Sequence, residues 1–203
     1  VGNSTTLTIS PFVIDTTDPT LNEITPITTP TNNNSPSYVF SSNESGTITS
    51  SLSFSSTNTA INGNNTITFF NLSDNTYSGE TITVTDTVGN STTLTISTFI
   101  VDATAPHLNE VTPINTTNDN TPSYVFSSNE SGTITSSLSF TSTTTAVNGN
   151  NTITFSSLSD GNYSGQYVIV TDAGGNSTTL TISPFVVDTS DPTLNEITPI
   201  TTP

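Results

Sequence analysis

The chain has no lysine, arginine, cysteine, methionine or tryptophan among its 203 residues. Its sixteen acidic residues meet no basic side chain, so the formal net charge is −16 at pH 7. Binding to nucleic acid or to an anionic membrane surface requires cationic side chains against phosphate. The composition therefore excludes nucleic-acid partners. No run of 18 apolar residues occurs either, so we expect no direct membrane insertion.

The missing residue types also limit covalent chemistry and catalysis. Without cysteine there are no disulfides or thiolate metal sites, and without lysine no Lys–Asn isopeptide crosslink can form. His107 is the only histidine, and the equivalent positions elsewhere in the chain are Thr20 and Thr193. Serine nucleophiles would have no lysine or second histidine to activate them. Carboxylate pairs of the glycosidase type stay open by residue type, but no spacing singles one out. We predict that the protein is not an enzyme and has no catalytic residues.

One stretch recurs along the chain and defines a repeat. It runs from Asp86 to Asp102, and closely similar stretches end at Asp15 and Asp188. The equivalent glycines, Gly2, Gly89 and Gly175, are separated by 87 and 86 residues, which indicates a unit of that length. We therefore expect a C-terminal strand and linker of a preceding module at 1–18, whole modules at 19–105 and 106–191, and the first strand of a following module at 192–203.

Serine and threonine number 78, a bias that is also typical of disordered, mucin-like stalks. Against that alternative, Leu, Ile, Val and Phe total 50 of 203 residues, about a quarter, whereas disorder is expected below roughly 20%. Threonine is itself a strand former because its branched Cβ suits a pleated surface. We interpret the chain as folded β modules.

Alternating apolar residues predict seven short strands in each module and no helix. Pro26 indicates a bulge or an edge in the first strand, and a phase change near Thr98 returns Phe99 and Val101 to the inward face of the last. The pattern predicts an all-β fold of antiparallel sandwiches with an up-and-down course. In the first module the strands are expected at Leu21–Ile27, Ser37–Ser41, Thr47–Phe54, Thr57–Ile61, Thr66–Phe69, Thr81–Asp86 and Ser91–Asp102.

Three motifs carry a resemblance to a known family. They are Thr83-Val-Thr-Asp86-x-x-Gly89-Asn90, Asp102-x-Thr-x-Pro106-x-Leu108 and Thr121-Pro-Ser-Tyr-Val-Phe126. They resemble the tandem bacterial Ig-like repeats of large extracellular adhesins and biofilm-associated surface proteins. The spacing before Tyr77 and Tyr163 is similar to the tyrosine corner of such sandwiches. The resemblance implies a structural spacer or stalk at the bacterial cell surface, with neighbouring copies of the same repeat as partners and a tip ligand that the sequence does not identify.

Twelve of the sixteen acids recur in register, and no cationic side chain can neutralise them. An up-and-down course would bring Asp102, Glu130 and Asp172 to one pole, with Asp74 or Glu110 as further ligands. The equivalents one unit earlier are Asp15, Glu44 and Asp86. Sets of oxygen ligands suit Ca²⁺, which takes six to eight of them, so we predict calcium at module junctions, as the adhesin resemblance also implies. The alternative is that these acids only cap turns and keep the surface soluble.

Three further interpretations stay open from the sequence. The segments Ser4–Asp15 and Leu194–Thr202 could complete neighbouring subunits by strand addition and so build a self-assembling extracellular filament. Flat threonine-rich faces could bind ice or polysaccharide, although they are more often the solvated side of a sandwich. Asn-x-Ser/Thr triplets such as those at Asn43, Asn64 and Asn90 are glycosylation acceptors only in a host with the machinery.

Overall fold

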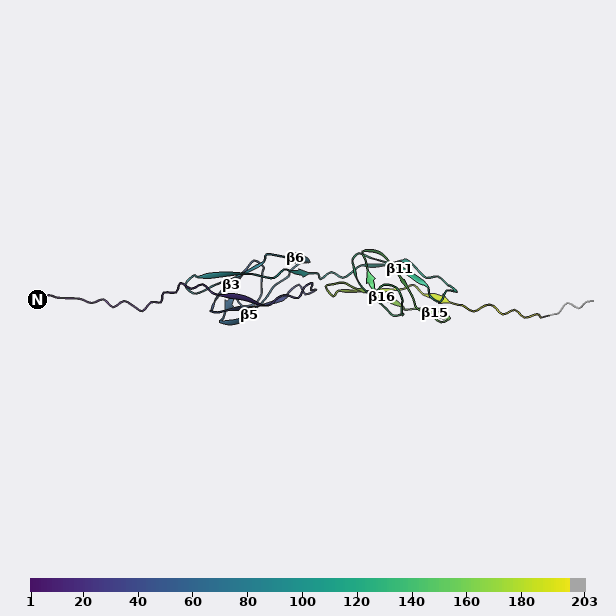
Figure 1. The fold of residues 1–203 in the computed structure, drawn as a ribbon, viewed down its shortest axis with the longest axis horizontal. Coiled ribbons are helices and arrows are strands. Elements are labelled where there is room, and N and C mark those ends of the chain that lie inside the picture. The colour runs from purple at the N-terminus through teal and green to yellow at the C-terminus, as the bar shows by residue number, and fades with distance from the viewer. Residues whose placement is uncertain (198–203) are drawn as a thin grey trace, which may run out of the picture. The chain divides into compact units, whose positions relative to one another are not determined.

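The computed structural model describes residues 1–197 and divides into two compact units, Val1–Asp102 and a second unit that begins at Ala103 (Figure 1). Every regular element in the described residues is a strand, so the predicted all-β class is confirmed. No helix in this part of the chain is long and apolar enough to cross a membrane.

Within residues 1–197, each unit contains nine strands in the same order. Those of the first unit are β1 (Leu21–Thr25), β2 (Ser37–Ser42), β3 (Gly46–Ser50), β4 (Thr59–Ala60), β5 (Gly63–Thr68), β6 (Asn75–Tyr77), β7 (Thr81–Thr85), β8 (Ser91–Thr95) and β9 (Phe99–Val101). Those of the second are β10 (Leu108–Thr112), β11 (Ser123–Ser128), β12 (Gly132–Ser136), β13 (Thr145–Ala146), β14 (Gly149–Thr154), β15 (Gly161–Tyr163), β16 (Tyr167–Thr171), β17 (Ser177–Thr181) and β18 (Phe185–Val187).

The strands of the first unit form antiparallel sheets in the orders β1-β2-β5, β4-β3-β7-β8 and β6-β9. Figure 1 labels β3 and β5, which belong to different sheets. The predicted up-and-down course is therefore wrong, because the chain changes sheet after β2, β4, β5, β6 and β8. The physical reason is that each sheet has one apolar face, and the crossings let both faces bury against a single core.

The strand count differs from the predicted seven at two places. The three-residue β6 was missed because a short polar segment has no alternation, yet it pairs with β9 through Tyr77 and Phe99. The expected last strand is divided into β8 and β9, because the Ser97 N–H donates to a side chain and not to the ladder. The phase change predicted there is real, since Phe99 and Val101 are both buried.

The chain contacts a second sheet after β1 ends. The β1–β2 register shifts between Glu23 and Thr25, the bulge expected near Pro26. The chain then runs parallel to β9, where Thr31 N donates to Ile100 O (3.0 Å) and Asp102 N donates to Thr31 O (2.9 Å). Thr117 makes the same parallel bridge to Val187 in the second unit. The segment entering each unit is thus bonded directly to the strand leaving it.

Each unit has one apolar core, to which the two larger sheets and the short two-stranded sheet all contribute. In the first, fully buried Tyr38, Phe40 and Phe69 face Ile82 and Val84. The second core repeats these positions almost without change: Leu108, Ile114, Tyr124, Phe126, Ile134, Ala146, Ile153, Phe155, Val168, Val170, Ile182, Phe185 and Val187. At about 1.5–3 kcal/mol for each large buried side chain, burial is the main stabilising term in each unit.

Gly46 is required by space and not by its backbone angles. A Cβ there would lie against the Thr85 carbonyl oxygen and Val84 Cγ1 on the neighbouring β7. We expect Gly46→Ala to destabilise the first unit by about 1–3 kcal/mol, because β3 must move away from β7. Urea unfolding followed by circular dichroism measures this as an earlier first transition. Gly161→Ala is the control, since a Cβ at Gly161 meets nothing within 4 Å; an equal loss in both variants would contradict the steric explanation.

Candidate functional site

Three of the predicted metal-binding acids meet at one end of the first unit. Asp15 precedes β1, Glu44 lies in the turn between β2 and β3, and Asp86 follows β7. Each offers a carboxylate oxygen, and these oxygens lie within 4.8 Å of one another. The fold therefore gathers acids from three distant segments into a cluster, which we call the acidic triad.

Asp86 organises the turn between β7 and β8. Its Oδ1 accepts the N–H groups of Val88 (2.9 Å), Gly89 (2.7 Å) and Asn90 (2.9 Å), and its Oδ2 accepts Asn90 Nδ2 (2.8 Å). Burial raises the pKa of Asp86, but these hydrogen bonds outweigh it and lower the pKa overall. Asn90 Nδ2 also donates to the Asp15 carbonyl oxygen (3.2 Å), which joins the turn to the entering segment. The turn-capping role that sequence reasoning offered as the alternative is thus present at Asp86.

The repulsion between the carboxylates of the acidic triad is seen in the pKa of Glu44. Burial, followed by the negative charges of Asp15, Asp86 and Asp18, raises the pKa of the Glu44 carboxyl group. No lysine or arginine exists in the chain to oppose this repulsion. The donors are all carboxylate oxygens, which suit a hard divalent cation such as Ca²⁺. Asp86 Oδ2, with one hydrogen bond, has capacity left for such an ion, whereas Oδ1 is occupied by three N–H groups.

In the second unit the counterparts Glu130 and Asp172 offer carboxylate oxygens within 4.8 Å of each other. Asp172 is only 8% exposed and accepts Asn176 N and Nδ2, both at 2.9 Å. Asp102, the counterpart of Asp15, is the last residue of the first unit. The β6–β9 register sets Asn75 opposite Val101, so Asp74 and Asp102 lie at the same end of that unit.

Glu23 and its counterpart Glu110 have a different role, which sequence reasoning missed. Glu23 Oε2 accepts the Tyr38 hydroxyl (2.9 Å) and Ser97 N (3.0 Å), while Oε1 accepts Ser97 Oγ (2.6 Å). Glu110 makes the same three bonds to Tyr124 and Ser183 at 3.0, 3.0 and 2.6 Å. Glu110, considered above as a further calcium ligand, is thus bonded within its own unit. The available signal was its recurrence together with the tyrosine and the serine.

These hydrogen bonds change the pKa values of both Glu23 and Tyr38. Burial raises the pKa of Glu23, but the bonds from the Ser97 side chain and backbone and from Tyr38 outweigh it, so the pKa is lowered overall. Burial and the Glu23 carboxylate together raise the pKa of Tyr38. The glutamate therefore stays charged and the tyrosine stays protonated at neutral pH, which keeps β1, β2 and the β8–β9 connection joined.

The two tyrosines singled out by spacing bind their own chain. Tyr77 Oη donates to Ser73 O and Tyr163 Oη donates to Ser159 O, each at 2.9 Å and four residues upstream. Tyr77 also stacks on Phe99 of β9, with ring centroids 5.0 Å apart. Each tyrosine therefore joins the turn before the short edge strand to the core.

Residues 113–189 match the family model of the bacterial Ig-like domain. The match covers β11 to β18 of the second unit, and the first unit has the same strands and pairings. No curated protein matches the chain. Ig-like domains of this kind are typically non-enzymatic, and they commonly occur in surface or extracellular proteins. The match therefore indicates a structural or surface domain.

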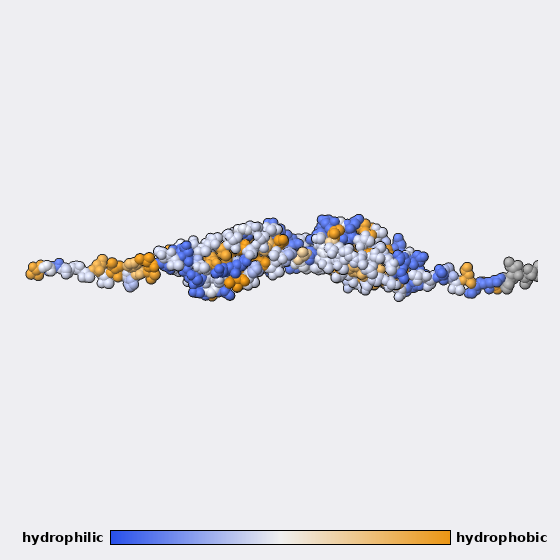
Figure 2. Space-filling view, viewed as in Figure 1, coloured by the Kyte–Doolittle hydropathy of each residue, from blue (hydrophilic) through white to orange (hydrophobic). Residues whose placement is uncertain are grey.

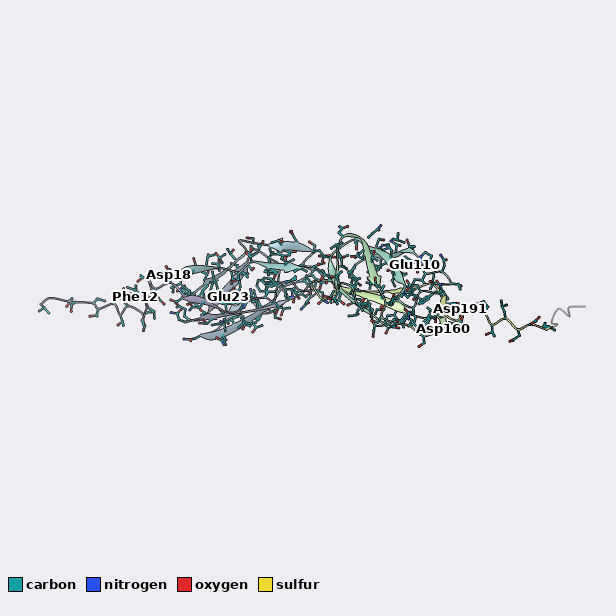
Figure 3. The ribbon with its side chains drawn as sticks, turned by 45° about the vertical axis from the view of Figure 1, so that its right-hand side comes forward. Phe12, Asp18, Glu23, Glu110, Asp160 and Asp191 are labelled. Atoms are coloured by element: carbon teal, nitrogen blue, oxygen red, sulfur yellow. The ribbon has the colours of Figure 1, made fainter. Side chains whose placement is uncertain are left out.

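Asp160 holds the segment that leaves the second Ig-like module. It accepts Thr189 N (2.8 Å), Thr189 Oγ1 (2.7 Å) and Ser190 Oγ (2.7 Å), and these bonds lower the pKa of the carboxyl group. Figure 3 labels it beside Asp191. Asp74 is its counterpart in the first module. Only the recurrence of this acid, and not its chemistry, could have been noticed in the sequence.

The segment before the first Ig-like module exposes a series of apolar side chains. Leu7 is 89% exposed and Phe12 is 73% exposed, and residues 1–20 contain no strand. Figure 2 shows the apolar atoms in orange along this segment, and Figure 3 labels Phe12 on it, away from Glu23 in the module body. The counterparts of Ile9 and Phe12 are Ile96 and Phe99, both buried. These side chains are therefore of the kind that an Ig-like module buries.

Proposed function

We propose that the chain is part of the extended extracellular stalk of a large bacterial surface adhesin, in which the Ig-like modules supply reach and mechanical persistence. The parallel pairing of Thr31 with β9 is the observation that supports this most directly. Force pulling the two ends of a module apart would shear these hydrogen bonds together, which resists extension better than breaking them one by one. The second module has the equivalent bridge at Thr117.

Stretching single molecules between their ends tests the mechanical part. Two unfolding events are expected, one for each module. Thr31→Pro removes the donor to Ile100 O and should lower the force of one event, while Thr117→Pro should lower that of the other. Each module serves as the control for its neighbour. Unchanged forces in both variants would argue against a load-bearing role for this pairing.

Denaturing electrophoresis of native material, boiled with detergent and chelator, tests whether the modules are joined covalently in a long array. A covalent species far above the 21.2 kDa of this chain supports a long tandem array. A discrete small subunit, or a ladder that collapses to one on boiling, supports assembly by strand exchange instead.

The second candidate function is therefore a filament joined by β-strand complementation. It is favoured by the sequence of residues 7–14, because the counterparts of Ile9, Phe12 and Ile14 are Ile96, Phe99 and Val101, which the first module buries. Light scattering at rising protein concentration should then show assembly, and Phe12→Asp should abolish it. Phe70→Asp is the control, since Phe70 is also exposed but lies outside this segment. A chain that stays monomeric throughout would exclude the filament.

We also propose that the acidic triad binds Ca²⁺ and that Glu130 and Asp172 are the corresponding ligands in the second unit. The proximity of the Asp15, Glu44 and Asp86 oxygens and the raised pKa of Glu44 support it. The calcium would neutralise the like charges and join the entering segment to the module. The calcium ion would have a structural role and no catalytic one.

A thermal melt in millimolar calcium against chelator tests this proposal. Ligand at a hundredfold excess over Kd stabilises by about 2.7 kcal/mol, and each kcal/mol raises the Tm of such a domain by about 4–8 °C. Glu44→Gln should abolish the shift while leaving the melt in chelator unchanged or slightly higher, because it removes repulsion. Glu80→Gln is the matched control outside the acidic triad. Identical melts with and without calcium would exclude the site.

A further inference from the structure

One outward face of the first module consists entirely of hydroxyl side chains. It belongs to the sheet β4-β3-β7-β8, whose opposite face buries Ile48, Ile82 and Val84 in the core. We call it the threonine face. Its nine positions, all serine or threonine, are Thr47, Thr49, Thr59, Thr81, Thr83, Thr85, Ser91, Thr93 and Thr95.

The threonine face is a lattice and not a single row. Cross-strand register aligns Thr59, Thr47, Thr85 and Ser91 in one line, Thr49, Thr83 and Thr93 in a second, and Thr81 with Thr95 in a third. Neighbouring strands lie about 4.7–4.9 Å apart, and alternate residues along a strand about 6.6–6.8 Å apart. Methyl and hydroxyl groups therefore repeat at nearly constant spacing in two directions.

The side chains of this face have restricted conformations. Threonine is stiff about χ1 because of its branched Cβ. The hydroxyls of Thr83 and Thr93 are also hydrogen-bonded to each other at 2.8 Å. Ordering these groups against a ligand would therefore cost little conformational entropy.

Strand formation and solubility do not explain this composition. The outward positions of the other sheet of the same module are mixed and include Asn22, Val39 and Asn64. In the second module the equivalents of Thr81 and Thr83 are Tyr167 and Ile169. The equivalent sheet of the second module, β13-β12-β16-β17, has the same strand order without this composition, so the uniform hydroxyl composition is specific to one face of one module.

We propose that the threonine face binds ice. A periodic set of uncharged groups matches a ligand that is itself periodic and uncharged. None of the nine positions carries a carboxylate, so no tightly hydrated charge lies within the face itself. A polysaccharide is the less favoured ligand, because sugar rings pack well on aromatic side chains and this face has none. The inference is independent of the stalk proposal.

The twist of the sheet limits how much of the threonine face can contact an ice surface. Neighbouring strands rotate by about 20–25°, so only the central part of the lattice, on β3, β7 and β8, meets a flat crystal plane at one time. We therefore expect adsorption to ice and slower recrystallisation, and little depression of the freezing point.

The experiment grows ice slowly from a solution of the full chain carrying a fluorescent label and compares the label in the ice with that in the liquid. The wild-type chain should be enriched in the ice. T81Y/T83I, which gives the first module the residues that the second already has, should lose that enrichment while keeping its melting behaviour. N64Y/T66I makes the same kinds of change on the other sheet and should keep it.

The reverse variant, Y167T/I169T, should increase enrichment by completing a second threonine face. The proposal is overturned if the wild-type chain is excluded from ice, or if T81Y/T83I is enriched equally. Capture of the wild-type chain by insoluble cellulose or chitin, with loss in T81Y/T83I and no ice adsorption, would replace ice with a polysaccharide as the ligand.

Discussion

Phe99→Ala should lower the stability of the first module by about 3–5 kcal/mol and leave the second module unchanged. The Phe99 side chain is 1% exposed, and its ring stacks on Phe69 at 6.4 Å and on Tyr77 at 5.0 Å. Truncation leaves a cavity beside Phe69 and Tyr77 that the rigid sheets cannot close. It also removes the aromatic contact that holds the short β6 to the core.

Urea unfolding monitored by circular dichroism should therefore separate into two transitions, with the first shifted to lower denaturant. Phe70→Ala is the matched control, because Phe70 follows Phe69 directly but is 54% exposed, so its loss should change little. Phe185→Ala should move the other transition, since Phe185 stacks on Tyr163 at 5.0 Å in the second module. A single cooperative transition shifted equally by all three variants would show that the modules do not unfold independently.

Glu23→Gln should cost the first module about 1.5–3 kcal/mol, the range for hydrogen bonds to a charged group. The neutral amide weakens the bonds from Tyr38 and Ser97, and its NH₂ group cannot accept the hydrogen bonds that the carboxylate oxygen it replaces accepted. Thermal melts measure the loss. Glu80→Gln is the control, since Ser51 donates to Glu80 at 2.6 Å and the second module already has Gln166 bonded to Ser137 at 2.8 Å. Equal losses of stability in the two variants would show that the hydrogen bonds of Glu23 stabilise the module no more than the single bond of Glu80.

The same network predicts how stability depends on pH. The pKa of Glu23 is lowered in the folded module, so the unfolded chain binds the proton more readily. The stabilisation is fully present above the ordinary glutamate pKa of 4.5 and is lost as pH falls through the folded value. The stability difference between the wild type and Glu23→Gln should therefore shrink as pH falls below about 4.5. A difference that stays constant down to acid denaturation would show that the carboxylate charge does not contribute.

Much of the local structure could be predicted because alternation is a property of neighbouring residues. The burial of Ile48 or Ile67 follows from the period of two along a strand, and the return of Phe99 to the core follows from the phase change at Thr98. The chain crossing after β2 could not be predicted in this way, since alternation does not say which sheet a strand joins. The short β6 was invisible because its three residues find their partners in β9, more than 20 residues later.

The acidic residues show the same difference between what the sequence determines and what the tertiary structure decides. The sequence alone determined that they recur and that no lysine or arginine can neutralise them. Only the tertiary structure decided their roles: Glu23 meets Ser97, 74 residues away, while Asp15, Glu44 and Asp86 meet one another. The reason is that composition and periodicity act locally, whereas the environment of a carboxylate depends on segments that only folding brings together. In the same way, the sequence determined that threonine is abundant, and the cross-strand register alone arranged nine hydroxyl side chains on one face.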